Sequence, residues 1–321
     1  AGEGPLVTEA YVAAHRRVIV AVVATALALL GLTGTGAVQT TAAAQTASVP
    51  EHYVALGDSY AAGPEIPVQR FDPIGCRRST SNYPSLVAAA LGIRDFTDVS
   101  CTGAQTENMT DPQRVPLGIN PPQFNALAPD TDLVTLTISG NDIGFSDIFI
   151  TCARLSSTNP LGNPCERQAT AGGTDIYAQR IDAEAPNVAR VLEGIRQRSP
   201  RATVLLVGYL RIVPPETGCY PVFPIARGDV PYLDGIQQQL NAMLADQASD
   251  HGAVLVDSYA GSLGHDACKL PGVKWVEGVA PTSPAAPVHP NAIGMRAVAA
   301  LALDALREPE FSDVSDVITL R

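Results

Sequence analysis

Short apolar segments alternate with helical patterns along most of this chain, and this alternation constrains the fold more than any other feature of the sequence. From about Ser48 onward, five segments are short and rich in apolar residues, as buried strands are. They cover residues 52–56, 96–100, 133–138, 203–207 and 253–256. Strands joined through helices run parallel, and helices then cover both faces of the sheet. The sequence therefore predicts one three-layer α/β/α domain over residues 48–321.

Helical patterns lie between and after these strands. Asn82 is a typical N-cap, Pro84 suits a first helical turn, and Gly92 suits a helix end, so the pattern predicts a helix between Asn82 and Gly92. Further helical patterns cover residues 181–198, 232–248 and 291–306. We expect loops at residues 151–172 and 214–230, and no long amphipathic lid helix.

The first 47 residues have the composition of an N-terminal extension followed by a secretory signal peptide. Basic residues at 15–17 precede an apolar run over residues 18–32, and small residues follow, with an Ala-x-Ala exit at residues 42–44. A membrane anchor is the alternative, but the run is shorter than the roughly 20 residues that a spanning helix prefers. We expect removal of residues 1–47 and export of a protein without stable membrane insertion.

Charge and cysteine content narrow the class of protein. The net charge of -11 argues against a nucleic-acid partner, which would need a basic face. The six cysteines include no C-x-x-C pair, so a metal site is not expected, and an exported chain favours disulfides. The sequence alone does not choose among the possible pairings. Sequential pairing is the simplest, because each bridge closes a local loop; it joins Cys76 to Cys101, Cys152 to Cys165 and Cys219 to Cys268.

Four residues with useful chemistry lie close to the ends of predicted elements. Ligands of an open parallel sheet bind outside the carboxyl ends of its strands. Ser59, Gly103 and Asn141 follow the first three strands, and His289 precedes the last helix. Each alone is commonly a cap, a turn residue or a surface side chain. Together they offer what acyl transfer requires: a serine nucleophile, a histidine base, and oxyanion donors in the Ser59 and Gly103 amides and the Asn141 side chain.

The order of these residues resembles that of the SGNH (GDSL) hydrolase family. Gly57-Asp58-Ser59 resembles its first block, Gly103 in VSCTGAQT its second, and His289 its last. Gly140-Asn141-Asp142 resembles its G-x-N-D block short by one spacer, reading S-G-N-D. The resemblance spans residues 53–306 and is to the secreted actinobacterial branch of esterases, lipases and phospholipases with three disulfides. It implies a flavodoxin-like fold with five parallel strands in the order 2-1-3-4-5, and no cofactor.

One position departs from the family pattern. Many members carry an aspartate three residues before the histidine, and here that residue is Ala286. No carboxylate lies between Glu277 and His289. We therefore expect the carbonyl of Ala286 or Pro287 to orient the base, which makes a dyad rather than a triad. A distant acid is the alternative, with Asp266 and Glu277 nearest in sequence.

These features predict a secreted serine esterase or lipase, acting as a monomer on small-molecule or lipid esters through an acyl-enzyme. Removal of acetyl groups from extracellular polysaccharide is an alternative that the same site could perform. A secreted binding module without catalysis is another. Hydrolysis of a series of p-nitrophenyl esters distinguishes the three.

Overall fold

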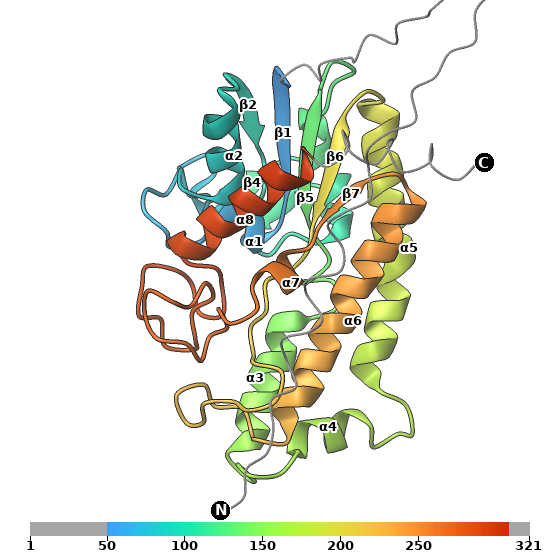
Figure 1. Ribbon diagram of the computed structural model, residues 1–321. Coiled ribbons are helices and arrows are strands. Elements are labelled where there is room, and N and C mark those ends of the chain that lie inside the picture. Colours follow the sequence, from blue (N-terminus) through green and yellow to red (C-terminus); the bar gives the residue numbers. More distant parts are fainter. Residues whose placement is uncertain (1–49, 308–321) are drawn as a thin grey trace, which may run out of the picture. The chain divides into compact units, whose positions relative to one another are not determined.

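Five parallel strands form the central sheet, in the order β2-β1-β5-β6-β7 (Figure 1). The computed structural model describes residues 50–307, so the predicted extension and signal peptide at residues 1–47 lie outside the described residues. The strands are β1 His52–Gly57, β2 Asp95–Asp98, β5 Leu133–Thr137, β6 Thr203–Val207 and β7 Val254–Val256. Counted along the chain, this is the order 2-1-3-4-5, so the predicted fold class is confirmed.

The middle of the sheet is buried on both faces. Every residue of β5 is buried, and so is every residue of β1 after His52. In the register, Tyr53 lies beside Leu133, which in turn lies beside Thr203. Strands covered on both faces carry continuous apolar runs instead of alternating ones. This is why the segments could be recognised from sequence.

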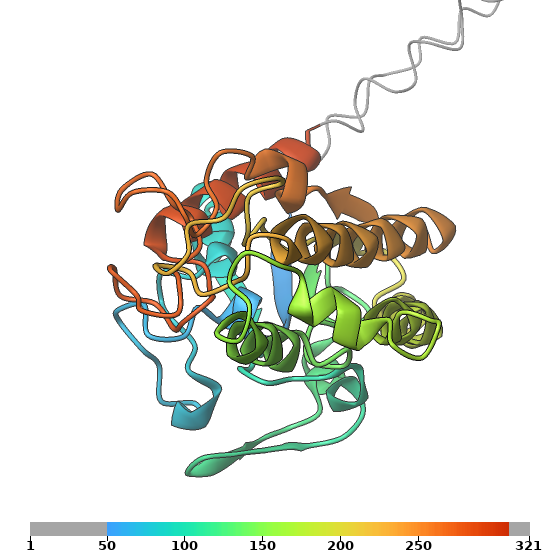
Figure 2. The same ribbon diagram turned by 90° about the horizontal axis from the view of Figure 1, so that it is seen from below.

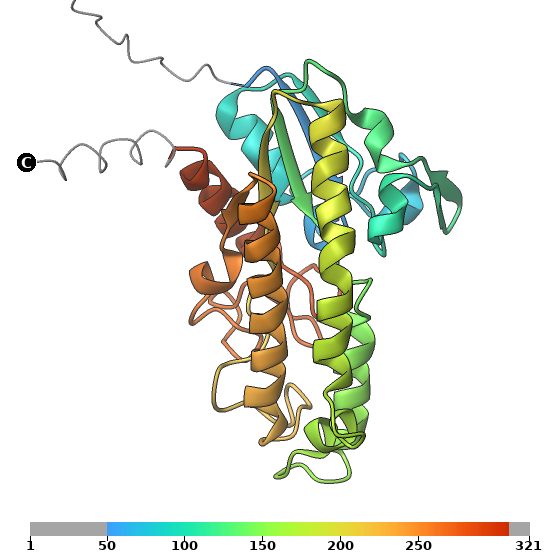
Figure 3. The ribbon, with the colours of Figure 1, turned by 90° about the vertical axis from the view of Figure 1, so that its right-hand side faces the viewer.

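Two pairs of helices form the layers on either side of the sheet (Figures 1 and 3). In one pair α2 (Tyr83–Leu91) packs against α8 (Ala292–Ala305), and in the other α5 (Ile176–Arg198) packs against α6 (Asp229–Asp250). Asn82 caps α2 and Gly92 ends it in the left-handed conformation, as predicted. α5 begins earlier than expected because the Asp175 carboxylate accepts hydrogen bonds from the amides of Tyr177 and Ala178.

Two segments differ from the prediction. Residues 151–172, expected to be a loop, are largely occupied by the end of α3 (Phe145–Ser156) and by α4 (Pro164–Ala169). After β2 the chain also forms a hairpin of β3 (Gln113–Val115) and β4 (Gly118–Asn120), which was not predicted. Seen along the strands, this hairpin projects from the side of the domain (Figure 2). Residues 214–228 contain no helix or strand, as expected.

The cysteines pair sequentially, as Cys76–Cys101, Cys152–Cys165 and Cys219–Cys268. The first bridge joins the loops after β1 and β2, and the second joins α3 to α4. No helix within residues 50–307 combines the length and the apolar composition needed to cross a bilayer.

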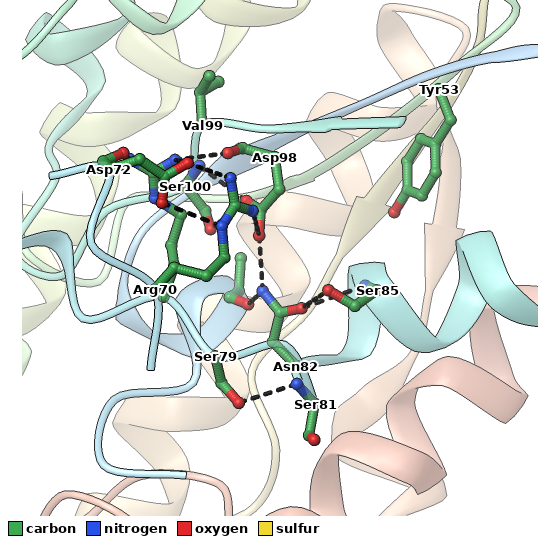
Figure 4. A network of polar contacts seen from close by, with 12 residues as sticks. Tyr53, Arg70, Asp72, Ser79, Ser81, Asn82, Ser85, Asp98, Val99 and Ser100 are labelled. Atoms are coloured by element: carbon green, nitrogen blue, oxygen red, sulfur yellow. Dashed lines mark hydrogen bonds and ion pairs between the residues drawn. The ribbon is translucent and has the colours of Figure 1, made fainter. Parts of the chain in front are cut away.

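A buried polar network supports the short helix α1 (Ser59–Ala62), which follows β1 (Figure 4). The Asn82 amide group donates to the Ala61 carbonyl at 2.9 Å and to the Asp98 carboxylate at 2.8 Å. Its oxygen accepts from the amide and the hydroxyl of Ser85. Each polar atom of the Asn82 side chain is therefore satisfied, as a fully buried amide requires. The network fixes the position of the turn that carries Ser59.

Candidate active site

A tight turn connects β1 to Ser59. Gly57 has a φ of 142°, and a Cβ at this position would lie 2.5 Å from the Thr137 carbonyl oxygen, so only glycine fits. Asp58 caps α1 by accepting a hydrogen bond from the Tyr60 amide at 2.8 Å. Ser59 is thus the first residue of the helix, and its N–H group has no intrahelical acceptor.

His289 contacts Ser59 directly. Its Nε2 atom lies 2.8 Å from Oγ of Ser59, and its Nδ1 atom lies 2.7 Å from the carbonyl oxygen of Pro287. A carbonyl oxygen only accepts hydrogen bonds, so Nδ1 carries the proton of the neutral ring. Nε2 is then an acceptor, and it can take the proton of the Ser59 hydroxyl. The orienting group is one of the two carbonyls that the sequence suggested.

Neither of the two carboxylates nearest in sequence forms a hydrogen bond with the His289 ring. Glu277 binds the Lys274 ammonium at 2.7 Å and accepts from the Thr282 amide and the Asn291 side chain. Burial opposes its ionisation, but these partners prevail and lower the pKa of Glu277 to about 2. Asp266 accepts from the Cys268 amide and lies 3.5 Å from the Lys269 ammonium. Both carboxylates are occupied elsewhere, which favours the dyad over a triad.

The surroundings of His289 favour the neutral form of its ring. Burial lowers its pKa from the usual histidine value, because the charged imidazolium loses hydration. Arg77 also lowers the pKa, whereas the Pro287 carbonyl and Glu65 act in the opposite direction. A neutral ring is the form that can act as a base.

The predicted oxyanion donors lie on neighbouring loops. The Asn141 side chain donates one N–H to the Ala104 carbonyl at 2.8 Å, which orients its second N–H for another acceptor. The Gln105 side chain donates to the backbone carbonyl of Asn141. Gly103, with a φ of 80°, lies on the same loop as Ala104. Asn141 lines the groove described below together with Ser59 and His289, whereas Gly103 is not among the groove-lining residues.

A groove of about 640 Å³ opens beside Ser59. It is lined by a stripe along α3, by Pro224 and Val279, and by the loop that carries His289. The stripe consists of Phe145, Ser146, Phe149, Ile150, Ala153 and Arg154. This set recurs every four residues, so it lies on one face of the helix. The walls are mostly apolar, and Arg154 is the one basic residue among them besides His289.

Tyr60 and Tyr209 also line the groove, and sequence reasoning missed both. The Tyr209 hydroxyl donates to the Asp58 carboxylate and accepts from the Gly140 amide at 2.7 Å. Burial raises the pKa of Asp58 to about 7, although the hydrogen bond from Tyr209 opposes this. Tyr209 follows β6 at the carboxyl edge of the sheet, so the rule that located Ser59 and Asn141 would have located it too.

Trp275 and His265 do not line the groove. Their rings stack at 4.1 Å, and Trp275 packs against the core. Among residues 50–307, no group of three or more His, Cys, Asp and Glu side chains is arranged to hold a metal ion.

Comparison with known proteins places this site in a family. Residues 55–297 match the GDSL-like Lipase/Acylhydrolase family. Lipase 2 of Streptomyces coelicolor is 41% identical, over 91% of this chain and 98% of its own length. An esterase of Streptomyces scabiei is 34% identical, over 79% of this chain and 81% of its own length. Among solved structures, phospholipase A1 from Streptomyces albidoflavus has a TM-score of 0.65 and 29% identity, covering 81% of this chain and 99% of that one. Since the family match runs from within β1 to within α8, the chain belongs to the GDSL-like lipase/acylhydrolase family and is a carboxylic ester hydrolase.

Proposed function

We propose that the protein is an exported acyl-ester hydrolase in which Ser59 is the nucleophile and His289 the base. The observation that carries this proposal is the 2.8 Å contact between Ser59 Oγ and His289 Nε2, two residues that line the apolar groove. His289 accepts the hydroxyl proton as Oγ attacks the ester carbonyl, and it returns that proton to the leaving alcohol. Water then repeats the sequence on the acyl-enzyme and releases the acid.

The oxyanion of each tetrahedral intermediate would be bound by the amides of Ser59 and Gly103 and by the Asn141 side chain. Support comes from Asn141, which lines the groove and keeps one N–H after its bond to the Ala104 carbonyl. Such donors stabilise charge that develops only during the reaction, so they act mainly on turnover. Losing one of them typically reduces turnover by about 100- to 1,000-fold.

The groove along α3 fits the acyl chain of the ester. From Phe145 to Arg154 the stripe extends roughly 13 Å, at about 1.5 Å per residue. Its apolar side chains would gain from covering a hydrocarbon chain. An acetyl group would fill only the end beside Ser59. The Streptomyces relatives, which include lipases and a phospholipase A1, agree with acyl chains longer than acetyl.

Export of the enzyme is supported by three features. The sequence carries a signal-like segment before residue 48, the six cysteines are paired, and a structural relative from Streptomyces rimosus, at a TM-score of 0.60, is an extracellular lipase. Disulfides persist in oxidising compartments. We propose that the exported form is a monomer whose substrates are small-molecule or lipid esters.

Hydrolysis of p-nitrophenyl esters of increasing chain length tests the proposal. Wild-type protein should cleave them, Ser59→Ala should abolish turnover, and an organophosphonate should label Ser59. Ser157→Ala, an exposed serine at the end of α3, is the control and should behave as wild type. Full activity in Ser59→Ala contradicts the mechanism. Activity confined to acetyl esters would indicate the polysaccharide deacetylase, and a folded protein that cleaves no ester would indicate the binding module.

A further inference from the structure

The residue before His289 has a backbone conformation that its side chain disfavours. Val288 has a φ of 60°, in the left-handed region that β-branched residues rarely adopt. Its own N–H donates only a long hydrogen bond, 3.3 Å to the Gly278 carbonyl. Such a conformation persists only where surrounding groups impose it. At Val288 it determines where the next residue, His289, is placed.

Tyr60 supplies a contact that holds Val288. The Tyr60 hydroxyl donates to the Val288 carbonyl at 2.7 Å, across 228 residues of sequence. Tyr60 is 8% exposed, and its ring lies 5.2 Å from the His289 ring and 5.0 Å from that of Tyr209. Burial raises the pKa of Tyr60 further above the neutral range, so the phenol remains protonated and remains a donor.

A second contact joins the same two segments. The Ala286 amide donates to the carbonyl of Pro64, just beyond the end of α1, at 3.1 Å. The loop that carries the base is therefore attached at two points to the segment that carries Ser59. Both contacts flank Pro287, whose carbonyl receives the Nδ1 proton of His289.

We propose that Tyr60 is a positioning residue, which holds Val288 in its left-handed conformation and thereby aims the Pro287 carbonyl at Nδ1 of His289. The Pro287 carbonyl is part of the peptide bond between Pro287 and Val288. Holding the backbone of Val288 in place therefore also fixes the direction of this carbonyl. A triad carboxylate has two oxygens and a full charge with which to orient an imidazole, whereas a neutral carbonyl depends on its direction alone. Tyr60 supplies that direction where, among residues 50–307, the partner of Nδ1 is a carbonyl and not a carboxylate. This inference rests on the Ser59–His289 mechanism proposed above.

Tyr60→Phe tests the inference because it keeps the ring and removes only the hydroxyl. We expect kcat to fall about tenfold or more on a short p-nitrophenyl ester, with KM changed less than about threefold, since orientation of the base matters in the transition state. The rate of organophosphonate labelling of Ser59 should fall in parallel. Tyr53→Phe is the matched control: this tyrosine is also buried, but its hydroxyl binds Thr135 within the sheet at 2.7 Å. It should lower the melting temperature and leave kcat unchanged.

Val288→Gly provides a second, independent variant. Glycine adopts a φ of 60° without penalty, so the hydrogen bond from the Tyr60 hydroxyl should matter less when residue 288 is glycine. We expect the effect of Tyr60→Phe on kcat to shrink to less than about threefold in the Val288→Gly background, a coupling that a purely structural hydroxyl would not show.

Two results would overturn the positioning role. One is a wild-type kcat in folded Tyr60→Phe, and the other is an equal loss of kcat in both backgrounds. His289→Ala separates this outcome from failure of the proposed function. If His289→Ala is inactive while Tyr60→Phe is fully active, only the role of Tyr60 is wrong. If His289→Ala retains activity, the dyad itself is wrong.

Discussion

At the scale of single residues, the protonation of His289 determines where on the pH scale the enzyme works. Its pKa is lowered, mainly by burial, so the neutral base persists at a pH where an exposed histidine is protonated. We therefore expect the acidic limb of kcat/KM to have its midpoint below the usual histidine value of about 6.5. A pH profile at constant ionic strength measures this midpoint. A midpoint at or above about 6.5 would contradict the environment described for the ring.

Arg77 offers a check on the direction of that shift. Its positive charge lowers the pKa of His289, and its partner Glu65 raises it. Arg77→Gln removes the positive charge and leaves Glu65 unpaired, and both changes raise the pKa of His289. The acidic limb should move to higher pH while the plateau rate stays near the wild-type value.

The proposed dyad leads to a second prediction. Asp266→Asn and Glu277→Gln should each reduce kcat by less than about tenfold, because neither carboxylate forms a hydrogen bond with the His289 ring. Neutralising a true triad acid lowers the rate by about 10⁴. Glu277→Gln should nevertheless lower stability, since it breaks a buried pair with Lys274. Initial rates of folded variants measure the first effect. A loss near the triad value in either variant would identify a missing acid.

The chemistry of the site was largely predictable from the sequence, whereas its supporting contacts were not. Ser59, Gly103 and Asn141 follow strands, and strand ends can be read from local apolar patterns. The lack of a carboxylate between Glu277 and His289 led to the prediction of a carbonyl beside the base, and the Pro287 carbonyl lies 2.7 Å from Nδ1. Tyr60 and Tyr209 meet their partners across 228 and 151 residues. The family pattern pairs Ser59 with His289 across 230 residues, but no pattern reports the partners of these two tyrosines, because those contacts depend on how the loops pack after the sheet has formed.

At the scale of elements, α3 is the clearest difference between prediction and structure. Its N-cap is Gly144, which has no side chain to signal a helix start. Phe145, Phe149 and Ala153 recur at helical spacing and line the groove, and the two phenylalanines are also buried in the core. α4 has only 6 residues, too few for a periodic pattern, and is joined to α3 by a disulfide. Without a start signal, three apolar residues at helical spacing do not distinguish a short helix from a loop.

The groove along α3 gives a prediction about substrate length. Ala153 lies two turns beyond Phe145 on the same face, so Ala153→Phe should fill the distal half of the groove. We expect activity on long-chain p-nitrophenyl esters to fall at least about tenfold relative to acetyl and butyryl esters, mainly through KM. Ser157→Phe places the same ring at an exposed position outside the groove and should leave the chain-length profile unchanged. An unchanged profile in Ala153→Phe would mean that the acyl chain lies elsewhere.

At the scale of the whole molecule, the disulfides separate stability from catalysis. Cys76–Cys101 and Cys219–Cys268 close 25 and 49 residues, so loop entropy assigns them similar stabilisation, about 3.5 and about 4 kcal/mol. Only the first lies next to a predicted oxyanion donor: the Thr102 amide donates to the Cys76 carbonyl at 3.0 Å, and Gly103 follows.

We expect Cys76→Ala/Cys101→Ala to lower both the urea midpoint and the kcat of the folded protein. Its kcat should fall by up to about 100-fold, the lower value for one lost oxyanion donor. Cys219→Ala/Cys268→Ala is the control and should lower the urea midpoint comparably while kcat on a short ester stays near wild type. Double variants leave no unpaired thiol from the deleted bridge, which keeps the comparison free of disulfide exchange. If both pairs lower stability and neither lowers kcat, the loop of Gly103 does not depend on its bridge, and the donor role of Gly103 loses its structural support.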